Sequence, residues 1–240
     1  MTPAPTVHAS PEAGGRAVAD RIRELAAGAL RARGRFSIGV SGGASPVPLF
    51  EALARAGAGG EPDRVWSVYW CDERLVPPGD ARSNFALARR TWLEPARVPS
   101  DRVHPVPVEL GERGAAEHYE SALRAAADVG DGAALDVAVL GVGPDGHTAS
   151  LFPGRPALQE PRRWVVAEPD PGREPRVARV TLSLVGLASA RRAIFLAWGE
   201  EKHAILARIL GGTAPELPAA RVRALESVEW HVDRAAWGGP

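Results

Sequence analysis

The chain has 240 residues, of which 45% are hydrophobic and 24% charged, so it can build a globular core and is not a disordered chain. Its formal net charge of +0 argues against a general binder of nucleic acid or anionic membranes, and we expect neither partner. The single cysteine, Cys71, excludes an internal disulfide and a multi-cysteine metal site. No signal peptide is visible, and no apolar run reaches the roughly 18 residues that span a bilayer, so we expect a cytoplasmic location.

Apolar patterning predicts helices and strands that alternate along the chain. Ser10 and Pro11 form a helix-start signal, and the 168–175 segment, rich in proline, reads as a loop that we expect to be mobile. This alternation predicts an α/β fold with a mainly parallel sheet and helices on both faces. In chain order, the predicted elements are a helix over 11–33, a strand at 36–40, a helix over about 46–56, a strand at 65–70, a helix over about 82–93, a short segment at 103–106, a helix over about 112–127, strands at 135–140, 163–167, 176–184 and 193–198, a helix over 200–210, and an edge strand at 228–232.

The segment that follows the strand at 135–140 carries the most chemical information. Glycines at 141, 143 and 146 surround Asp145 and His147. Ligands of open α/β sheets bind outside the carboxyl ends of the strands, where a glycine-rich turn lets backbone N–H groups approach them. Asp145 and His147 add groups that can transfer protons. A metal site would need more ligands than one histidine and nearby carboxylates provide, so we expect no metal here.

A second strand end, at residues 41–46, suggests a site for an anion. Gly42 and Gly43 lie between a strand and a helix start, where backbone N–H groups and the helix dipole favour negative charge. The hydroxyl groups of Ser41 and Ser45 add further donors, and phosphate is the natural ligand. Taken alone, the motif fits an ordinary turn equally well.

A third strand end carries Asp72, Glu73 and Arg74 in succession. Because side chains alternate along a strand, Asp72 and Arg74 are expected to point the same way into a crevice. The forked guanidinium of Arg74 suits a phosphate or a carboxylate. The alternative is a solvated, charged turn.

Together these blocks resemble the 6-phosphogluconolactonases, within the glucosamine-6-phosphate deaminase/isomerase superfamily. The resemblance covers nearly the whole chain and implies one domain over residues 1–240 with a Rossmann-like fold, of the NagB/RpiA/CoA-transferase-like type. A small departure is Ala44, where many relatives carry serine. The matching blocks are Ser-Gly-Gly-x-Ser-Pro at 41–46, Asp-Glu-Arg-x-Val-Pro-Pro at 72–78 with Ser83-Asn84, Gly-x-Gly-x-Asp-Gly-His-Thr-Ala-Ser-Leu-Phe-Pro-Gly at 141–154, Arg-Val-Thr-Leu-Ser-Leu at 179–184, and Phe195-Leu196 with Gly199 and Lys202.

The resemblance implies hydrolysis of 6-phospho-D-glucono-1,5-lactone to 6-phosphogluconate, the second step of the oxidative pentose phosphate pathway, without a cofactor. By the same resemblance, Lys202 and Arg179 are expected to hold the phosphate together with the Gly42-Gly43 loop. Relatives are often small monomers, so we expect a monomer or a weak homodimer.

Lactone hydrolysis needs an activated water and stabilisation of an oxyanion. His147 is the expected general base, because histidine titrates near neutral pH. Either Asp145 or Asp72 would orient its imidazole, as a carboxylate does in a catalytic triad. Either the N–H groups of a glycine-rich loop or Arg74 would stabilise the oxyanion. The chain has no Gly-x-Ser-x-Gly elbow, so a serine acyl-enzyme route is not supported.

Two alternatives remain, an enzyme of the same superfamily and a protein of another class. An amino-sugar-phosphate isomerase or deaminase typically continues the histidine loop with Phe-Asn-Glu-Pro, whereas this chain has Ser-Leu-Phe-Pro at 150–153 and lacks that carboxylate. A non-catalytic phosphosugar sensor usually carries a DNA-binding module, for which the segment before the first predicted strand offers no room. It would bind its ligand without turnover.

Overall fold

The computed structural model describes residues 4–57, 65–128 and 132–238. Its centre is a six-stranded sheet in which every neighbouring pair of strands is parallel. The strands, in spatial order, are β1 (Thr6–His8), β9 (Ser227–Asp233), β8 (Arg192–Ala197), β5 (Val137–Gly141), β2 (Ser37–Val40) and β3 (Ser67–Trp70). The predicted α/β fold class with a mainly parallel sheet is confirmed.

Three further strands form a separate antiparallel sheet. The order in this sheet is β4 (Asp72–Arg74), β7 (Arg179–Leu182) and β6 (Val165–Glu168). The strands expected at 163–167 and 176–184 therefore exist, but they pair outside the parallel sheet. Asp72–Arg74, expected as the charged end of a strand, is itself a strand. Apolar runs locate strands along the chain, but they do not reveal which partner or direction a strand takes.

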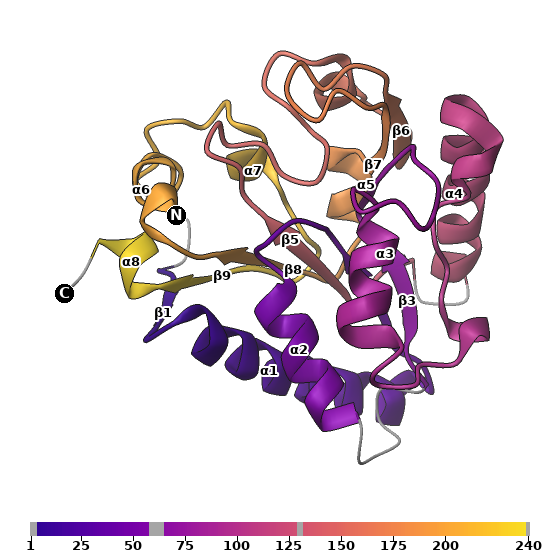
Figure 1. Cartoon of the computed structure of the whole chain (residues 1–240), viewed down its shortest axis with the longest axis horizontal. Coiled ribbons are helices and arrows are strands. Elements are labelled where there is room, and N and C mark those ends of the chain that lie inside the picture. The colour runs from indigo at the N-terminus through magenta and orange to yellow at the C-terminus, as the bar shows by residue number, and fades with distance from the viewer. Residues whose placement is uncertain (1–3, 58–64, 129–131, 239–240) are drawn as a thin grey trace.

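Helices surround the parallel sheet, and Figure 1 shows α1 and α2 side by side below it, with α7 above. Ser10 caps α1 by accepting a hydrogen bond from the N–H of Ala13 at 3.2 Å, as the helix-start signal predicted. The helices are α1 (Pro11–Arg33), α2 (Val47–Gly57), α3 (Asn84–Ala88) continuing into a π-helical turn (Arg89–Leu93), α4 (Gly111–Asp128), α5 (Leu184–Ala188), α6 (His203–Leu210), α7 (Pro218–Arg221) and α8 (Arg234–Trp237), with 3-10 turns at Ser100–Arg102, Val108–Leu110, Pro156–Gln159 and Glu200–Lys202.

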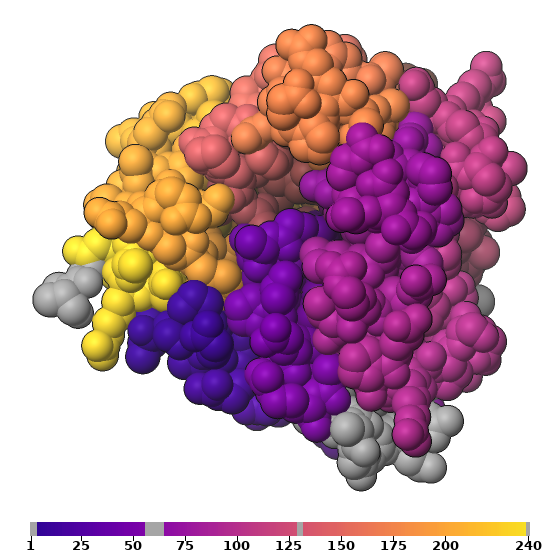
Figure 2. All heavy atoms as spheres, viewed as in Figure 1, coloured from indigo at the N-terminus to yellow at the C-terminus, as the bar shows by residue number. Residues whose placement is uncertain are grey.

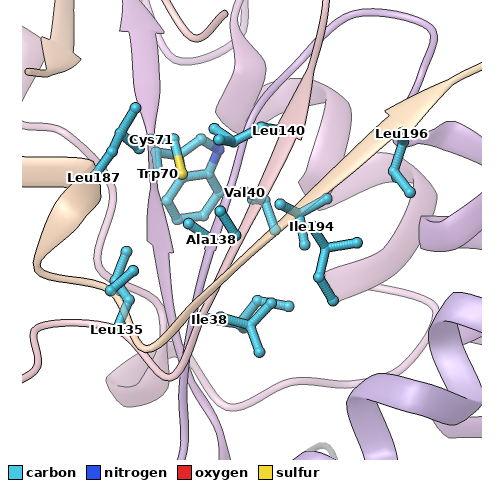
Figure 3. Packing of buried hydrophobic residues seen from close by; sticks show 14 of the residues in the cluster. Ile38, Val40, Trp70, Cys71, Leu135, Ala138, Leu140, Leu187, Ile194 and Leu196 are labelled. Carbon is cyan, nitrogen blue, oxygen red and sulfur yellow. The ribbon is translucent and has the colours of Figure 1, made fainter. Parts of the chain in front are cut away.

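The main core lies where apolar side chains of neighbouring strands meet. Because helices cover a parallel sheet, its strands read as continuous apolar runs, as the sequence showed at 36–40 and 135–140. Figure 3 shows this packing close by, with the following residues labelled: Ile38, Val40, Trp70, Cys71, Leu135, Ala138, Leu140, Leu187, Ile194 and Leu196.

The prediction that 228–232 is an edge strand is wrong. Strand β9 lies between β8 and the N-terminal strand β1, which forms the true edge. A three-residue strand is too short to show a periodic pattern, so β1 escaped prediction. At this edge the imidazoles of His8 and His231 stack, with Nε2 of His8 3.0 Å from Nδ1 of His231.

At the amino end of β5, the buried Asp136 joins three parts of the chain. Its Oδ2 accepts a hydrogen bond from the N–H of Ser37 at 2.8 Å. Its Oδ1 lies 2.5 Å from Nη2 of Arg33 and 3.4 Å from Nε of Arg191. This charge cluster fixes the end of the sheet opposite the strand ends at which the sequence predicts a site.

The structure refines the expectations for two further segments, 103–106 and 200–210. The segment at 103–106 forms no strand, although Val103 makes an isolated bridge to Val68 of β3. The helix expected over 200–210 begins as a 3-10 turn and becomes α-helical at His203.

Candidate active site

A cavity of about 380 Å³ opens at the carboxyl ends of β2, β5 and β8, beside the first strand of the antiparallel sheet. Figure 2 shows this face of the molecule hollowed beneath the orange segment. All the predicted site residues except Asp145 line the cavity. The site residues that do so are Ser41, Gly42, Gly43, Ser45, Asp72, Arg74, His147, Arg179 and Lys202.

The 41–45 loop follows β2 and forms one wall. Gly43 has a φ of +85°, a left-handed conformation that favours glycine. Within the described residues, the N–H groups of Gly42, Gly43 and Ala44 donate to no backbone acceptor. The carbonyl of Ser45 accepts a 2.7 Å hydrogen bond from the indole N–H of Trp198, which ties the loop to the end of β8. Free N–H donors before a helix form a suitable anion site.

Arg74 and Arg179 face each other across the β4–β7 pair, in direct register. Like charges placed opposite each other on a sheet repel. Burial, followed by the charge of Arg74, lowers the pKa of Arg179, whose side chain is only 4% exposed. Both arginines line the cavity. An anionic group between them would relieve the repulsion, so this wall is suited to an anion.

His147 is paired with Asp145. Nδ1 of His147 lies 2.5 Å from Oδ1 of Asp145, and the backbone N–H of His147 donates to the same oxygen at 3.2 Å. Arg173 donates to Oδ2 of Asp145 at 3.0 Å. Burial raises the pKa of Asp145, but the hydrogen bond and charge of His147, with Arg173, outweigh it and lower that pKa. The carboxylate therefore stays ionised beside the imidazole.

Asp72 has a different partner. Its Oδ2 accepts a 2.7 Å hydrogen bond from the hydroxyl of Ser150, and both side chains are buried. Of the two carboxylates considered for orienting His147, the geometry joins Asp145 to the imidazole. Asp72 is a carboxylate on the cavity wall.

The loop that carries His147 depends on unusual backbone positions. A Cβ at Gly143 would lie 2.0 Å from two atoms of the His147 ring, so the ring packs directly on the glycine backbone. Ala149 has a φ of 47°, which is uncommon for a residue with a side chain. Phe152 packs on the His147 ring at 4.7 Å between centroids, and Arg179 lies 5.4 Å over the same phenyl ring. Strained positions of this kind cluster at functional sites.

Sequence reasoning missed Arg173, although it predicted the other members of this cluster. Arg173 lies in the 168–175 loop, which the sequence indicated only as a loop with a mobile character. One arginine among prolines and acidic residues carries no motif, so only the folded chain shows its contact with Asp145.

Neither a metal cluster nor a membrane span is found in the parts of the chain that the structure describes. Over residues 4–57, 65–128 and 132–238, no group of three or more His, Cys, Asp or Glu side chains is placed to hold a metal ion. Among the helices in those ranges, none is long and apolar enough to cross a membrane.

The family model for glucosamine-6-phosphate isomerases/6-phosphogluconolactonase matches residues 9–230 of this chain. The chain belongs to this family. The rat 6-phosphogluconolactonase is 41% identical over 241 residues, which cover 98% of this chain and 93% of the rat protein. A solved 6-phosphogluconolactonase from Thermotoga maritima matches with a TM-score of 0.82 and 32% identity, covering 95% of this chain and 98% of that one. The structure of a 6-phosphogluconolactonase from Trypanosoma cruzi matches with a TM-score of 0.84 and 31% identity, covering 98% of this chain and 97% of that one.

Proposed function

We propose that this chain is a lactonase that hydrolyses 6-phospho-D-glucono-1,5-lactone to 6-phosphogluconate, in the second step of the oxidative pentose phosphate pathway. The observation that carries the proposal is the Asp145–His147 pair at the same cavity as a glycine loop for an anion. The named relatives with this activity, which match almost the full chain, support the choice of substrate.

In this proposal His147 is the general base. If Nδ1–H donates to Asp145, Nε2 carries the lone pair that removes a proton from water. The water oxygen bonds to the lactone carbonyl carbon, and the bond from that carbon to the ring oxygen then breaks. The imidazolium returns its proton to the departing ring oxygen, and the new carboxylic acid ionises. Asp145 stabilises the imidazolium between these steps.

The cationic groups divide between the two ends of the substrate. We assign the phosphate to the Gly42-Gly43 loop, Lys202 and Arg179, which line the cavity together. This assignment leaves Arg74 to stabilise the carbonyl oxygen as it becomes negative. A phosphate fixed at one end orients the reacting carbon at the other, and such positioning contributes a large part of the barrier reduction.

The contacts of the 150–153 segment favour a lactonase over an amino-sugar isomerase or deaminase. The hydroxyl of Ser150 donates a hydrogen bond to Asp72, and the phenyl ring of Phe152 packs on the His147 ring. These residues supply no additional carboxylate to shuttle protons between carbons. Hydrolysis needs no such group, because water and His147 provide the proton transfers.

The test is hydrolysis of freshly generated 6-phosphogluconolactone, after subtraction of spontaneous hydrolysis. We expect turnover by the wild type, loss of most of it in His147→Ala, and no change in His118→Ala, whose histidine is exposed on α4. Unphosphorylated gluconolactone should react far more slowly, because it lacks the phosphate anchor. Near-normal turnover by folded His147→Ala and His147→Gln variants would exclude His147 as the base. A folded wild type that binds the phosphosugar without turnover would favour a sensor.

A further inference from the structure

Glu73, Ser83 and Asn84 belong to one of the sequence blocks that carry the family resemblance, at 72–78 with Ser83-Asn84, yet none of them lines the cavity. Glu73 is 2% exposed and accepts four hydrogen bonds. The donors are the backbone N–H groups of Arg74 at 2.6 Å, Asn84 at 2.7 Å and Phe85 at 2.7 Å, and the hydroxyl of Ser83 at 3.0 Å. A buried carboxylate with this many donors fixes the start of α3 against β4.

This anchor places the side chain of Asn84 between two walls of the cavity. Asn84 is 1% exposed, and its Nδ2 donates to the carbonyl of Asp72 at 2.8 Å. On its other side lies the anion loop, so closely that a Cβ at Gly42 would be 1.8 Å from Oδ1 of Asn84. The amide thus fills the gap between the strand that carries Asp72 and the loop that carries Gly42 and Gly43.

We propose that Asn84 is a positioning residue that holds the Gly42-Gly43 loop at a fixed distance from Asp72 and Arg74, and thereby sets the affinity for the phosphorylated substrate. A glycine loop has no Cβ atoms with which to pack, so its position depends on what lies against its backbone. Asn84 lies against this backbone without lining the cavity itself. The inference rests on the proposed function, since it assigns the phosphate to this loop.

The first experiment compares Asn84→Ala with Ser83→Ala as a matched control. Ser83 caps α3 by accepting from the N–H of Ala86, and its hydroxyl donates to Glu73, so its loss weakens the same helix start. The three backbone donors to Glu73 and the Asn84 amide against Gly42 stay in place. We expect Asn84→Ala to raise KM, and the Kd for inorganic phosphate, by roughly 10-fold, since misplacing a positioning group by about 1 Å costs up to 10²-fold. The kcat should stay within about threefold, because the groups at the carbonyl carbon are untouched. Ser83→Ala should lower Tm with KM unchanged.

A double-mutant cycle tests the contact itself. Gly42→Ala places a methyl group on the Asn84 amide, and Asn84→Ala removes that obstacle. If the two residues act through this contact, the double variant raises KM by less than the product of the two single effects. Asn84→Asp keeps the shape of the side chain but replaces the donor to the Asp72 carbonyl with a carboxylate oxygen, so it should raise KM as well. This variant tests the positioning role if Asn84→Ala does not fold.

The outcomes separate cleanly. An unchanged KM and phosphate Kd in Asn84→Ala or Asn84→Asp, with a Tm loss like that of Ser83→Ala, would reduce Asn84 to a structural role and overturn the proposal. If the KM effects of Asn84→Ala and Gly42→Ala simply multiply in the double variant, the proposed action through the contact with Gly42 is refuted. A wild type without lactonase activity would refute the proposed function instead, and phosphate binding would still report on Asn84.

Discussion

Replacing Asp145 with asparagine tests how much the enzyme depends on an ionised partner for His147. Asp145→Asn keeps the shape of the side chain and removes its negative charge. In the proposed mechanism the ring of His147 becomes an imidazolium during turnover, and its Nδ1 lies 2.5 Å from Oδ1 of Asp145. The substitution therefore acts mainly on the imidazolium that the proposed proton transfer forms at His147.

The size of the effect follows from the exposure of the pair. Opposite unit charges about 4 Å apart attract by roughly 4 kcal/mol at an effective dielectric constant of about 20, and by about 1 kcal/mol in water. Because the Asp145 side chain is 38% exposed and also bonded to Arg173, we take about 2 kcal/mol, which is roughly 30-fold in kcat. An asparagine amide that donates to Nδ1 would also favour the wrong tautomer, a change that costs about 10⁴-fold in serine proteases.

The assay is kcat for lactone hydrolysis by Asp145→Asn, His147→Ala and the double variant. We expect a loss of at least about 30-fold in Asp145→Asn with little change in KM, since the phosphate contacts remain. If Asp145 acts through His147, the double variant should be no slower than His147→Ala. A loss below about threefold, or two losses that multiply in the double variant, would refute the dyad.

Three further predictions concern charge. Arg173→Gln should lower kcat/KM for the lactone severalfold, because it removes the cation that bonds Oδ2 of Asp145 at 3.0 Å and so holds this carboxylate beside His147; an unchanged kcat/KM would contradict this. Burial, reinforced by the charge of His231, lowers the pKa of His8 below 6.5, so the unfolded chain binds this proton more readily than the folded one. The free energy of unfolding should therefore fall as pH drops below about 6.5, and it should fall less in His8→Asn. Urea midpoints measured across this pH range check the difference between the two proteins. Asp136→Ala should destabilise the fold by about 3–5 kcal/mol in urea unfolding, since it removes a buried carboxylate that accepts from the N–H of Ser37 and pairs with Arg33 and Arg191; a loss below 1 kcal/mol would refute that.

The sequence predicted those parts of the fold that depend on local signals. The helix at Pro11–Arg33 has both ends where Ser10 and Gly34 place them, because a cap and a left-handed glycine act within one turn. The buried strands were visible as apolar runs. The antiparallel sheet was not, because Asp72–Arg74 is charged and forms a strand only through its partner β7. Strand pairing is a tertiary property that no local pattern records.

The candidate site follows the same rule. Glycines, Asp145 and His147 stand in one short segment, so their chemistry could be inferred before the fold was known. The contact of Arg173 with Asp145 spans 28 residues, and that of Asn84 with Gly42 brings together the start of α3 and the loop after β2. Neither residue type is unusual at its position. These contacts depend on packing between loops, and the sequence alone could not distinguish them from a solvated side chain.

The junction of the two sheets explains how a chain of zero net charge can build a site for an anion. The parallel sheet supplies backbone donors at the end of β2 and the Asp145–His147 pair after β5, and neither requires a net positive surface. The antiparallel pair β4–β7 then adds two cations in direct register, Arg74 and Arg179, on the same cavity. Side by side they repel, at a cost of roughly 0.2–1 kcal/mol for such a pair. A substrate that brings negative charge to both arginines reduces that repulsion, so binding energy is concentrated at the cavity while the rest of the surface stays balanced.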